Sequence, residues 1–309
     1  MKVLFMGTPD FAVPVLEGLI ENYNVIGVVS QPDKKVGRHH ELKNTPIKEV
    51  ALKHSILVLQ PLKIKEEYQD ILSLDPDLIV TCAYGQIIPK EILDYPKYGC
   101  INVHASLLPK YRGGAPIHRA IINGDKKTGV TIMYMDVGMD DGDIISQREI
   151  PILDTDNLET IQDKLSILGK ELLLDTLPSI LDGTNQRISQ NKEEVSFAYN
   201  ITREEEHIDF SKSNWEIFHL IRGLSTVPGA NATIFEHEMK IYDSIPLDKN
   251  YPNKKNGEIV DIDKRGIIVS CGEGSILLLS IKPFGKGIMD ASSYVNGIGK
   301  DKLIGQVFI

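Results

Sequence analysis

Residues 100–109 read Cys100-Ile101-Asn102-Val103-His104-Ala105-Ser106-Leu107-Leu108-Pro109, an apolar run of strand length that leads into polar residues. Side chains alternate between the two faces of a strand, so Asn102 and His104 share one face. In an open parallel sheet, the carboxyl end of a strand opens onto the crevice where such sheets bind ligands. The stretch therefore predicts a buried strand of an α/β domain, with a substrate site where that strand ends.

Other segments of the first half of the chain fit the same architecture. Apolar runs of strand length occupy residues 3–6, 24–30, 77–82 and 129–135, and helical spacing occupies residues 10–22, 45–54 and 64–74. Strands that alternate with helices indicate a parallel sheet, because each crossover helix covers one sheet face. A long amphipathic helix over residues 158–181, ended by Asp182-Gly183, could close the domain. We predict an α/β fold, a Rossmann-like, doubly wound and mostly parallel sheet, over residues 1–183.

The second half of the chain has a different pattern. Residues 184–205 are rich in Asn, Gln, Lys and Glu and have few apolar positions, which is typical of a solvated linker. A short helix near residues 215–223 is followed by short apolar runs separated by turn residues, at 232–235, 239–242, 258–263, 267–270 and 275–281. We therefore predict a small C-terminal β-barrel domain over residues 206–309.

Composition limits the possible functions. The chain has 309 residues and a formal net charge of -9. No apolar run approaches the roughly 20 residues of a spanning helix, and the first residues lack the features of a signal peptide, so we expect a soluble, cytoplasmic protein. The three cysteines form no CxxC pair, which argues against disulfides and a zinc site and predicts buried thiols without a metal. The negative charge excludes a protein that coats nucleic acid, so a polyanionic partner would need a local basic patch.

A second polar cluster, Asp136-Val137-Gly138-Met139-Asp140-Asp141-Gly142-Asp143, follows the predicted strand at 129–135. With Gly142 at the invariant glycine, an EF-hand would need ligands at Val137 and Met139, so a calcium loop is excluded. An Asn amide can stabilise a developing oxyanion, and a His with a carboxylate partner can move a proton. On the residues alone, both clusters could instead be polar turns that are only solvated.

The first strand and the loop after the second carry weaker signals. Gly7 stands alone, without the glycine pattern of a dinucleotide site, which disfavours an oxidoreductase. Residues 33–43 form a basic polar loop that contains Lys34, Lys35, Arg38 and Lys43. Such a loop is either a solvated surface or the local patch that a phosphate-bearing partner needs.

The residues from Asn102 to Pro109, followed by Tyr111-Arg112-Gly113-Gly114-Ala115-Pro116-Ile117 and the cluster at 136–143, resemble the folate-dependent formyltransferases. The resemblance extends over nearly the whole chain from Gly7 onward. It implies that a formyl group moves from 10-formyltetrahydrofolate to the α-amine of methionine on initiator Met-tRNA, without a metal. It matches Asn102, His104 and Asp140 to the catalytic residues of the family. It also matches Ser106, Leu107, Leu108 and Pro109 to the segment that contacts tetrahydrofolate.

The tRNA-specific members of this family resemble the chain in two further ways, a basic loop inserted in the first domain and a C-terminal OB-like barrel. The resemblance implies tRNA contacts from Lys34, Lys35, Arg38 and Lys43 in the loop, with Lys282 and Lys286 as plausible contacts in the barrel, where scattered surface lysines are the alternative. Residues 206–309 carry 12 Lys and Arg against 13 Asp and Glu, so most of the negative charge lies in the first 205 residues. We expect a monomer.

Two alternatives remain beside this function. One is formyl transfer to a small amine, such as glycinamide ribonucleotide or an amino-sugar nucleotide, which the basic loop and the barrel disfavour. The other is a non-catalytic RNA-binding relative, which the presence of Asn102, His104 and Asp140 disfavours.

Overall fold

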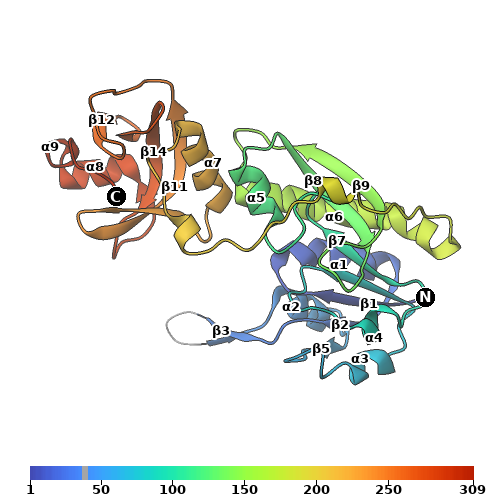
Figure 1. Cartoon of the computed structure of the whole chain (residues 1–309). Helices are drawn as coiled ribbons and strands as arrows, with labels where there is room; N and C mark the ends of the chain where they lie inside the picture. The colour runs from blue at the N-terminus through green and yellow to red at the C-terminus, as the bar shows by residue number, and fades with distance from the viewer. Residues whose placement is uncertain (37–40) are drawn as a thin grey trace. The chain divides into compact units, whose positions relative to one another are not determined.

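A computed structural model of the chain describes residues 1–36 and 41–309, and Figure 1 shows its elements in chain order. The chain divides into two compact units. The first unit comprises residues 1–116, 127–151 and 162–199, and the second comprises residues 117–126, 152–161 and 200–309. The linker at 184–205 and the domain bounds on either side of it stay a prediction.

The first unit is built on a seven-stranded sheet with the order β5-β2-β1-β6-β7-β8-β9. Its strands are β1 (Lys2–Gly7), β2 (Asn24–Val29), β5 (Val58–Leu59), β6 (Leu78–Cys82), β7 (Cys100–His104), β8 (Lys127–Tyr134) and β9 (Ile144–Pro151). The strands from β5 to β7 pair in parallel, whereas β8 and β9 pair antiparallel with their neighbours. The α/β fold with a mostly parallel sheet is confirmed.

The helices that connect these strands follow from local sequence signals. They are α1 (Val13–Asn22, after a 3-10 turn at Asp10–Ala12), α2 (Pro46–Lys53), α3 (Gln69–Ser73) and α4 (Lys90–Leu93). Helix α6 (Leu158–Asp182) follows β9, and its first four residues belong to the second unit. Thr45 caps α2 by accepting a hydrogen bond from the Lys48 amide, and Pro46 occupies the first turn, where its missing N–H is not needed. The helix predicted over 64–74 is shorter, since only Gln69–Ser73 is helical. Strand β9 was not predicted, because the polar run Ser146-Gln147-Arg148-Glu149 interrupts its apolar residues, as the edge of a sheet allows.

The second unit contains an antiparallel sheet with the order β10-β11-β14-β13-β12, and β15 pairs with β14. Its strands are β10 (Ala230–Ile234), β11 (His237–Leu247), β12 (Ile259–Asp263), β13 (Gly266–Ser270), β14 (Ser275–Lys282) and β15 (Met289–Asp290). The helices are α5 (Pro116–Ile122), α7 (Asn214–Leu224), α8 (Ala291–Ile298) and α9 (Lys300–Leu303), with 3-10 turns at Lys192–Glu194 in the first unit and Glu204–Glu206 in the second. Ile217 and Ile221 of α7 are buried in one core with Ile241 and Leu278 of the sheet. The predicted small C-terminal β domain is confirmed, and its strands pair antiparallel.

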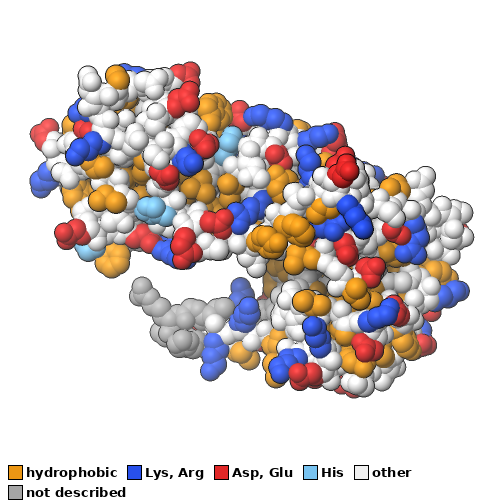
Figure 2. Space-filling model, in the orientation of Figure 1, with side chains coloured by type: hydrophobic (Ala, Val, Ile, Leu, Met, Phe, Trp, Pro, Cys, Tyr) orange, Lys and Arg blue, Asp and Glu red, His pale blue; other side chains and the backbone are white. Residues whose placement is uncertain are grey.

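The basic segment after β2 forms a short hairpin. Strand β3 (Lys34–Val36) pairs antiparallel with β4 (Glu41–Lys43), and Lys34 lies directly opposite Lys43. Basic side chains, drawn in blue, are visible on this hairpin in Figure 2, and in the described strands they are all lysines. Arg38, the fourth predicted contact of this segment, lies outside the described residues. In the described part of the chain, no helix has both the length and the hydrophobicity needed to cross a membrane.

Candidate active site

Asn102 and His104 lie on β7, a strand with β6 on one side and β8 on the other. Their positions two residues apart put both side chains on one face of the sheet, as the sequence predicts. His104 is only 6% exposed, and Asn102 is half-buried. The two side chains are therefore fixed by the centre of the sheet and not by a mobile loop.

The amide of Asn102 is oriented by the neighbouring strand. Thr81 of β6 lies beside Asn102 in the parallel register, and its hydroxyl donates to Asn102 Oδ1 at 2.8 Å. Thr81 is buried, so this bond is shielded from water. Because Oδ1 is the acceptor, the Nδ2 donors of Asn102 face the other way, where Asp140 Oδ1 lies 3.5 Å away.

The imidazole of His104 is held at one nitrogen. Nε2 lies 2.9 Å from the carbonyl oxygen of Tyr111, and a carbonyl can only accept, so Nε2 carries the proton of this bond. The other nitrogen, Nδ1, faces Asp140 Oδ2 at 3.7 Å. Nδ1 is consequently the ring nitrogen that can gain or lose a proton at the site.

Asp140 reaches this pair by a route that differs from the predicted one. The sequence suggests that two strand ends deliver the donor pair and the carboxylate to the same edge of the sheet. Strand β8 is antiparallel to β7, so its carboxyl end at Tyr134 lies opposite Ile101, near the start of β7. The prediction is wrong for β8, because the loop between β8 and β9 must fold back to bring Asp140 close to Asn102 and His104.

Asp140 is held by the segment that follows β7. Its Oδ2 accepts a hydrogen bond from the Gly113 amide at 2.8 Å, and its backbone is in the left-handed region with φ of 49°. Gly113 has φ of +119°, and a Cβ there would lie 2.9 Å from the carbonyl oxygen of Ala198. Only glycine, which has no Cβ, lets residues 113 and 198 approach so closely, and in this position the Gly113 amide reaches Asp140.

One site residue, Gln190, was missed because it lies in the predicted solvated linker. Its side-chain amide nitrogen donates to the carbonyl oxygens of Asp140 at 2.8 Å and of Gly142 at 2.9 Å. Its side-chain oxygen accepts from Arg112 Nε at 3.0 Å and Nη2 at 2.8 Å. A lone glutamine in a polar stretch gives no signal of such contacts, and only the fold brings residue 190 to the loop.

The predicted folate segment leaves β7 directly beside the three polar residues. Ser106 is buried, and its hydroxyl donates to the carbonyl oxygen of Lys110 at 2.7 Å. Leu108 is buried as well, and its amide donates to the hydroxyl of Thr131. Leu107 and Pro109 keep part of their apolar surface accessible. The side chains able to contact a flat, apolar ligand are therefore Leu107 and Pro109, while Ser106 and Leu108 shape the turn.

The lysines predicted to contact tRNA are all on the surface. Lys34, Lys35 and Lys43 are exposed on the β3–β4 hairpin, and within the described residues no carboxylate forms an ion pair with them. Lys282 and Lys286 are exposed in the second unit, on either side of Phe284, whose side chain is 69% exposed.

The three cysteines are buried free thiols, as the sequence predicts. Burial raises the pKa of each thiol, that of Cys271 to about 12. Across residues 1–36 and 41–309, no cluster of three or more His, Cys, Asp and Glu side chains is arranged as a metal site.

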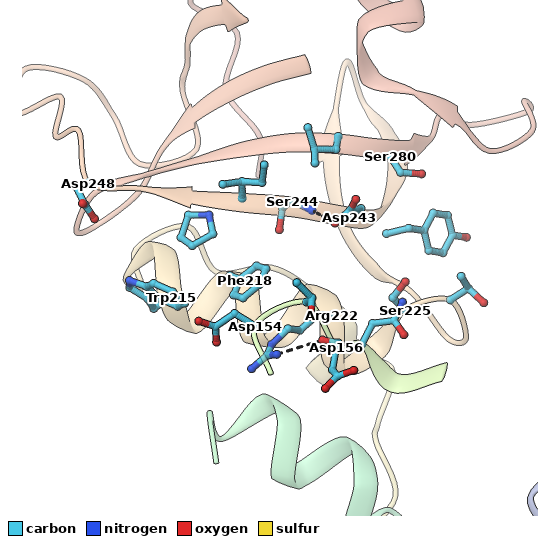
Figure 3. Close-up of a pocket in the computed structure, with 17 residues that line it drawn as sticks. Asp154, Asp156, Trp215, Phe218, Arg222, Ser225, Asp243, Ser244, Asp248 and Ser280 are labelled. Atoms are coloured by element: carbon cyan, nitrogen blue, oxygen red, sulfur yellow. Dashed lines mark hydrogen bonds between the residues drawn. The ribbon is translucent and has the colours of Figure 1, made fainter. Parts of the chain in front are cut away.

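A cavity of about 850 Å³ lies in the second unit, between α7 and the sheet (Figure 3). Figure 3 shows Asp156 and Arg222 on its lower side and Asp243 and Ser244 on the strand above. Its lining contains four carboxylates, from Asp154, Asp156, Asp243 and Asp248, against the single guanidinium of Arg222. This charge is unsuited to a polyanion, so we place no nucleic-acid contact in the cavity.

Comparison with known proteins identifies both halves of the chain. The formyl transferase family matches residues 1–177, and the C-terminal domain of formyl transferases matches residues 200–299. The methionyl-tRNA formyltransferase of Geobacillus sp. (strain WCH70) is 50% identical over 311 residues, covering 99% of this chain and 97% of that protein. The methionyl-tRNA formyltransferase of Bacillus thuringiensis (strain Al Hakam) is 50% identical over 303 residues, covering 96% of each protein.

A solved structure has the same fold. The N-formyltransferase of Helicobacter canadensis, in complex with folinic acid and dTDP-3-aminofucose, matches 92% of this chain and 100% of its own chain with a TM-score of 0.69. Its sequence identity is 22%, so the likeness concerns the fold alone.

Proposed function

The chain belongs to the formyl transferase family, and from this premise we propose that Asn102, His104 and Asp140 transfer the formyl group of 10-formyltetrahydrofolate to the methionine α-amine of initiator Met-tRNA. Its activity is that of a methionyl-tRNA formyltransferase, EC 2.1.2.9, since such enzymes share half of its residues over nearly their whole length. The observation that carries the catalytic assignment is the convergence of these three side chains on one face of β7. We take the monomer as the working unit.

In the proposed mechanism, two donors stabilise the charge that develops on the formyl oxygen when the amine attacks the formyl carbon. Asn102 Nδ2 points away from Thr81 and can donate to that oxygen. His104 can donate from Nδ1 when the ring carries both protons, because Nε2 is already bonded to Tyr111. Fixed donors aimed at developing charge lower the barrier to acyl transfer, and removing one such donor typically costs roughly 10²- to 10³-fold in kcat.

Asp140 acts in the proton transfers of the reaction. Its carboxylate lies 3.7 Å from His104 Nδ1, beyond hydrogen-bond length and close enough to stabilise a positive imidazole ring. The attacking amine loses a proton as the new C–N bond forms, and the leaving nitrogen of the donor gains one. Asp140, directly or through a water molecule, holds the proton on the ring and helps to move the proton of the amine.

Folate dependence is a property of the family, and the segment after β7 suits such a ligand. The turn at Ser106 and Leu108 is fixed by buried hydrogen bonds, so Leu107 and Pro109 present apolar surface next to His104. We assign the contact with the donor to this turn. The donor supplies the formyl group, and the residues of the chain bind it, orient it and carry protons.

In this proposal, two groups of basic residues contact the tRNA, one on the β3–β4 hairpin and one in the second unit. Lys34 and Lys43 are directly opposite each other in the β3–β4 hairpin, where like charges repel unless an anion lies between them. In the second unit, Lys282 and Lys286 flank exposed Phe284, and lysines mixed with an aromatic ring are typical of nucleic-acid-binding surfaces. Each place offers a few phosphate contacts without making the protein basic as a whole.

A direct assay tests the proposed function. Purified protein supplied with 10-formyltetrahydrofolate should formylate initiator Met-tRNA and should act much more slowly on elongator Met-tRNA. The control is the initiator tRNA without the formyl donor. Absence of product from charged initiator tRNA, together with turnover of a small amine, would overturn the assignment in favour of the small-amine alternative.

A further inference from the structure

We propose that Gln190 is a positioning residue. It holds the loop between β8 and β9, here called the Asp140 loop, in its catalytic geometry, and this inference rests on the proposed role of Asp140. Gln190 comes from a polar segment far along the chain from either loop that it contacts. Both polar atoms of its side chain form hydrogen bonds: the nitrogen donates to the Asp140 loop, and the oxygen accepts from Arg112.

The side-chain nitrogen of Gln190 fixes the backbone of the Asp140 loop. The side-chain amide of a glutamine has two N–H donors, and in Gln190 these meet the carbonyl oxygens of Asp140 and Gly142 at 2.8 and 2.9 Å. Between these two carbonyls the chain makes a sharp turn, since Asp140 has φ of 49° and a Cβ at Gly142 would lie 2.0 Å from the carbonyl oxygen of Tyr134. A left-handed conformation is unfavourable for a residue with a side chain, so it persists only where its surroundings hold it. The two hydrogen bonds from Gln190 hold the backbone of Asp140 in this conformation.

The oxygen end ties the same loop to the segment after β7. Arg112 donates two hydrogen bonds to Gln190 Oε1, at 3.0 and 2.8 Å. Arg112 itself is fixed, because its amide donates to the Ser196 carbonyl and its carbonyl accepts from the Ala198 amide. The next residue, Gly113, donates to Asp140 Oδ2.

These bonds close a ring around one residue. The backbone carbonyl of Asp140 is bonded to Gln190, Gln190 is bonded to Arg112, and Gly113 returns to the carboxylate of Asp140. Both the main chain and the side chain of Asp140 are thereby set relative to the segment that also holds His104 through Tyr111. The distance between Asp140 and His104 therefore depends on the Gln190 bridge.

The two ends of Gln190 can be separated by substitution. Gln190→Glu keeps an oxygen acceptor for Arg112, which has no carboxylate partner among the described residues, and so strengthens that end. The same change removes both N–H donors and turns a carboxylate oxygen toward the carbonyls of Asp140 and Gly142. Gln190→Ala removes both ends. Gln186→Ala is a matched control, because Gln186 is exposed on the same segment and its side chain makes no hydrogen bond found in the described part of the chain.

The experiment compares the full-length wild type with Gln190→Ala, Gln190→Glu and Gln186→Ala in steady-state kinetics with initiator Met-tRNA at saturating donor. A misplacement of about 1 Å can cost roughly 10²-fold in rate, so both Gln190 variants should lose roughly 10- to 100-fold in kcat. The KM for tRNA should stay near the wild-type value, and the acidic and basic limits of the kcat–pH profile should move, since Asp140 and His104 change their separation. Gln186→Ala should match the wild type in each measurement.

Two results would overturn the proposal. One is wild-type kcat in Gln190→Glu, which would mean that only the Arg112 end matters. The other is a raised KM with unchanged kcat in Gln190→Ala, which would make the contact one for binding. If Gln190→Ala does not fold, Gln190→Glu decides alone, because it keeps the Arg112 bond. Should the wild type formylate a small amine and not the tRNA, the proposed acceptor fails, and the same kinetics with that amine still test Gln190.

Discussion

The hydroxyl of Thr81 donates a hydrogen bond to Asn102 Oδ1 at 2.8 Å, between parallel neighbours β6 and β7. This bond decides which end of the Asn102 amide faces the site. With Oδ1 occupied, the N–H donors turn toward Asp140 and toward the place of the reacting oxygen. A buried threonine one strand away thus sets the direction of the donor that the proposed mechanism needs.

Thr81→Val tests this relationship, because valine keeps the shape of the side chain and removes the hydroxyl. Without the bond, the amide of Asn102 can rotate and present its oxygen to the site, so kcat should fall, by up to the roughly 10²-fold that losing one oxyanion donor typically costs. Kinetics with initiator Met-tRNA and thermal unfolding would measure activity and folding separately. Thr128→Val is the control, since Thr128 is also buried in the sheet and its hydroxyl makes no hydrogen bond found in residues 1–36 and 41–309. Equal kcat in the two variants would contradict the role of Thr81.

His104→Ala and Asp140→Asn test the proton-moving pair. Each change removes one member of a pair in which His104 Nδ1 and Asp140 Oδ2 are 3.7 Å apart, so turnover should fall by roughly 10²- to 10⁴-fold, as is typical of acid–base groups. Binding of tRNA should stay nearly intact, because neither side chain belongs to the basic surfaces. Asp140→Asn retains an oxygen that can accept from the Gly113 amide, so the loop should keep its shape. Full activity in both variants would show that His104 and Asp140 have no catalytic role.

The strand-level parts of the site could be predicted from the sequence. Asn102 and His104 are two residues apart in an apolar run, and the alternation of a strand is enough to place them on one face. The sequence could not reveal that β8 runs antiparallel to β7, because a buried strand has the same apolar pattern in either direction. The route of the Asp140 loop was therefore predicted wrongly, although Asp140 itself lies beside the pair.

Contacts between distant polar residues could not be predicted. Gln190 and Thr81 act through hydrogen bonds that span 50 and 21 positions in the chain, and neither residue type signals such a bond by itself. Helices α8 and α9 were also missed, since each is short and interrupted by glycine or charged residues. Patterns of hydrophobicity predict which strands exist, whereas the polar network depends on how those strands are packed.

The β3–β4 hairpin predicts a specific effect of salt. Lys34→Gln combined with Lys43→Gln removes two like charges that lie opposite each other, so the KM for tRNA should rise while kcat at saturating tRNA stays near wild type. The slope of log affinity against log salt should decrease by about 1 for each lysine that no longer neutralises a phosphate. Lys53→Gln, at the exposed end of α2, is a control for general charge. If the slope of log affinity against log salt is unchanged, the hairpin does not contact phosphates and is only a solvated surface.

The pair Arg119–Glu205 predicts how stability depends on pH. Two nitrogens of the Arg119 guanidinium contact the two carboxylate oxygens of Glu205 at 2.5 and 3.0 Å, and the bond to Arg119 is the main cause that lowers the pKa of Glu205 to about 2. A carboxyl whose pKa is lowered on folding stabilises the folded state above its unfolded pKa, and this contribution is lost as the pH falls toward the folded value. The window therefore runs from the ordinary glutamate pKa of 4.5 down to about 2.

Glu205→Gln should remove this pH dependence. Because the Glu205 side chain is 40% exposed, solvent screens the pair, and we expect a loss of no more than about 1 kcal/mol in the free energy of unfolding at pH 7. Between pH 4.5 and the lowest pH at which the protein stays folded, the curves of wild type and variant should converge, since acid protonates the wild-type carboxyl. Denaturant unfolding at several pH values would measure both. Parallel curves with a constant gap across that range would mean that the charge of Glu205 is not what stabilises the contact.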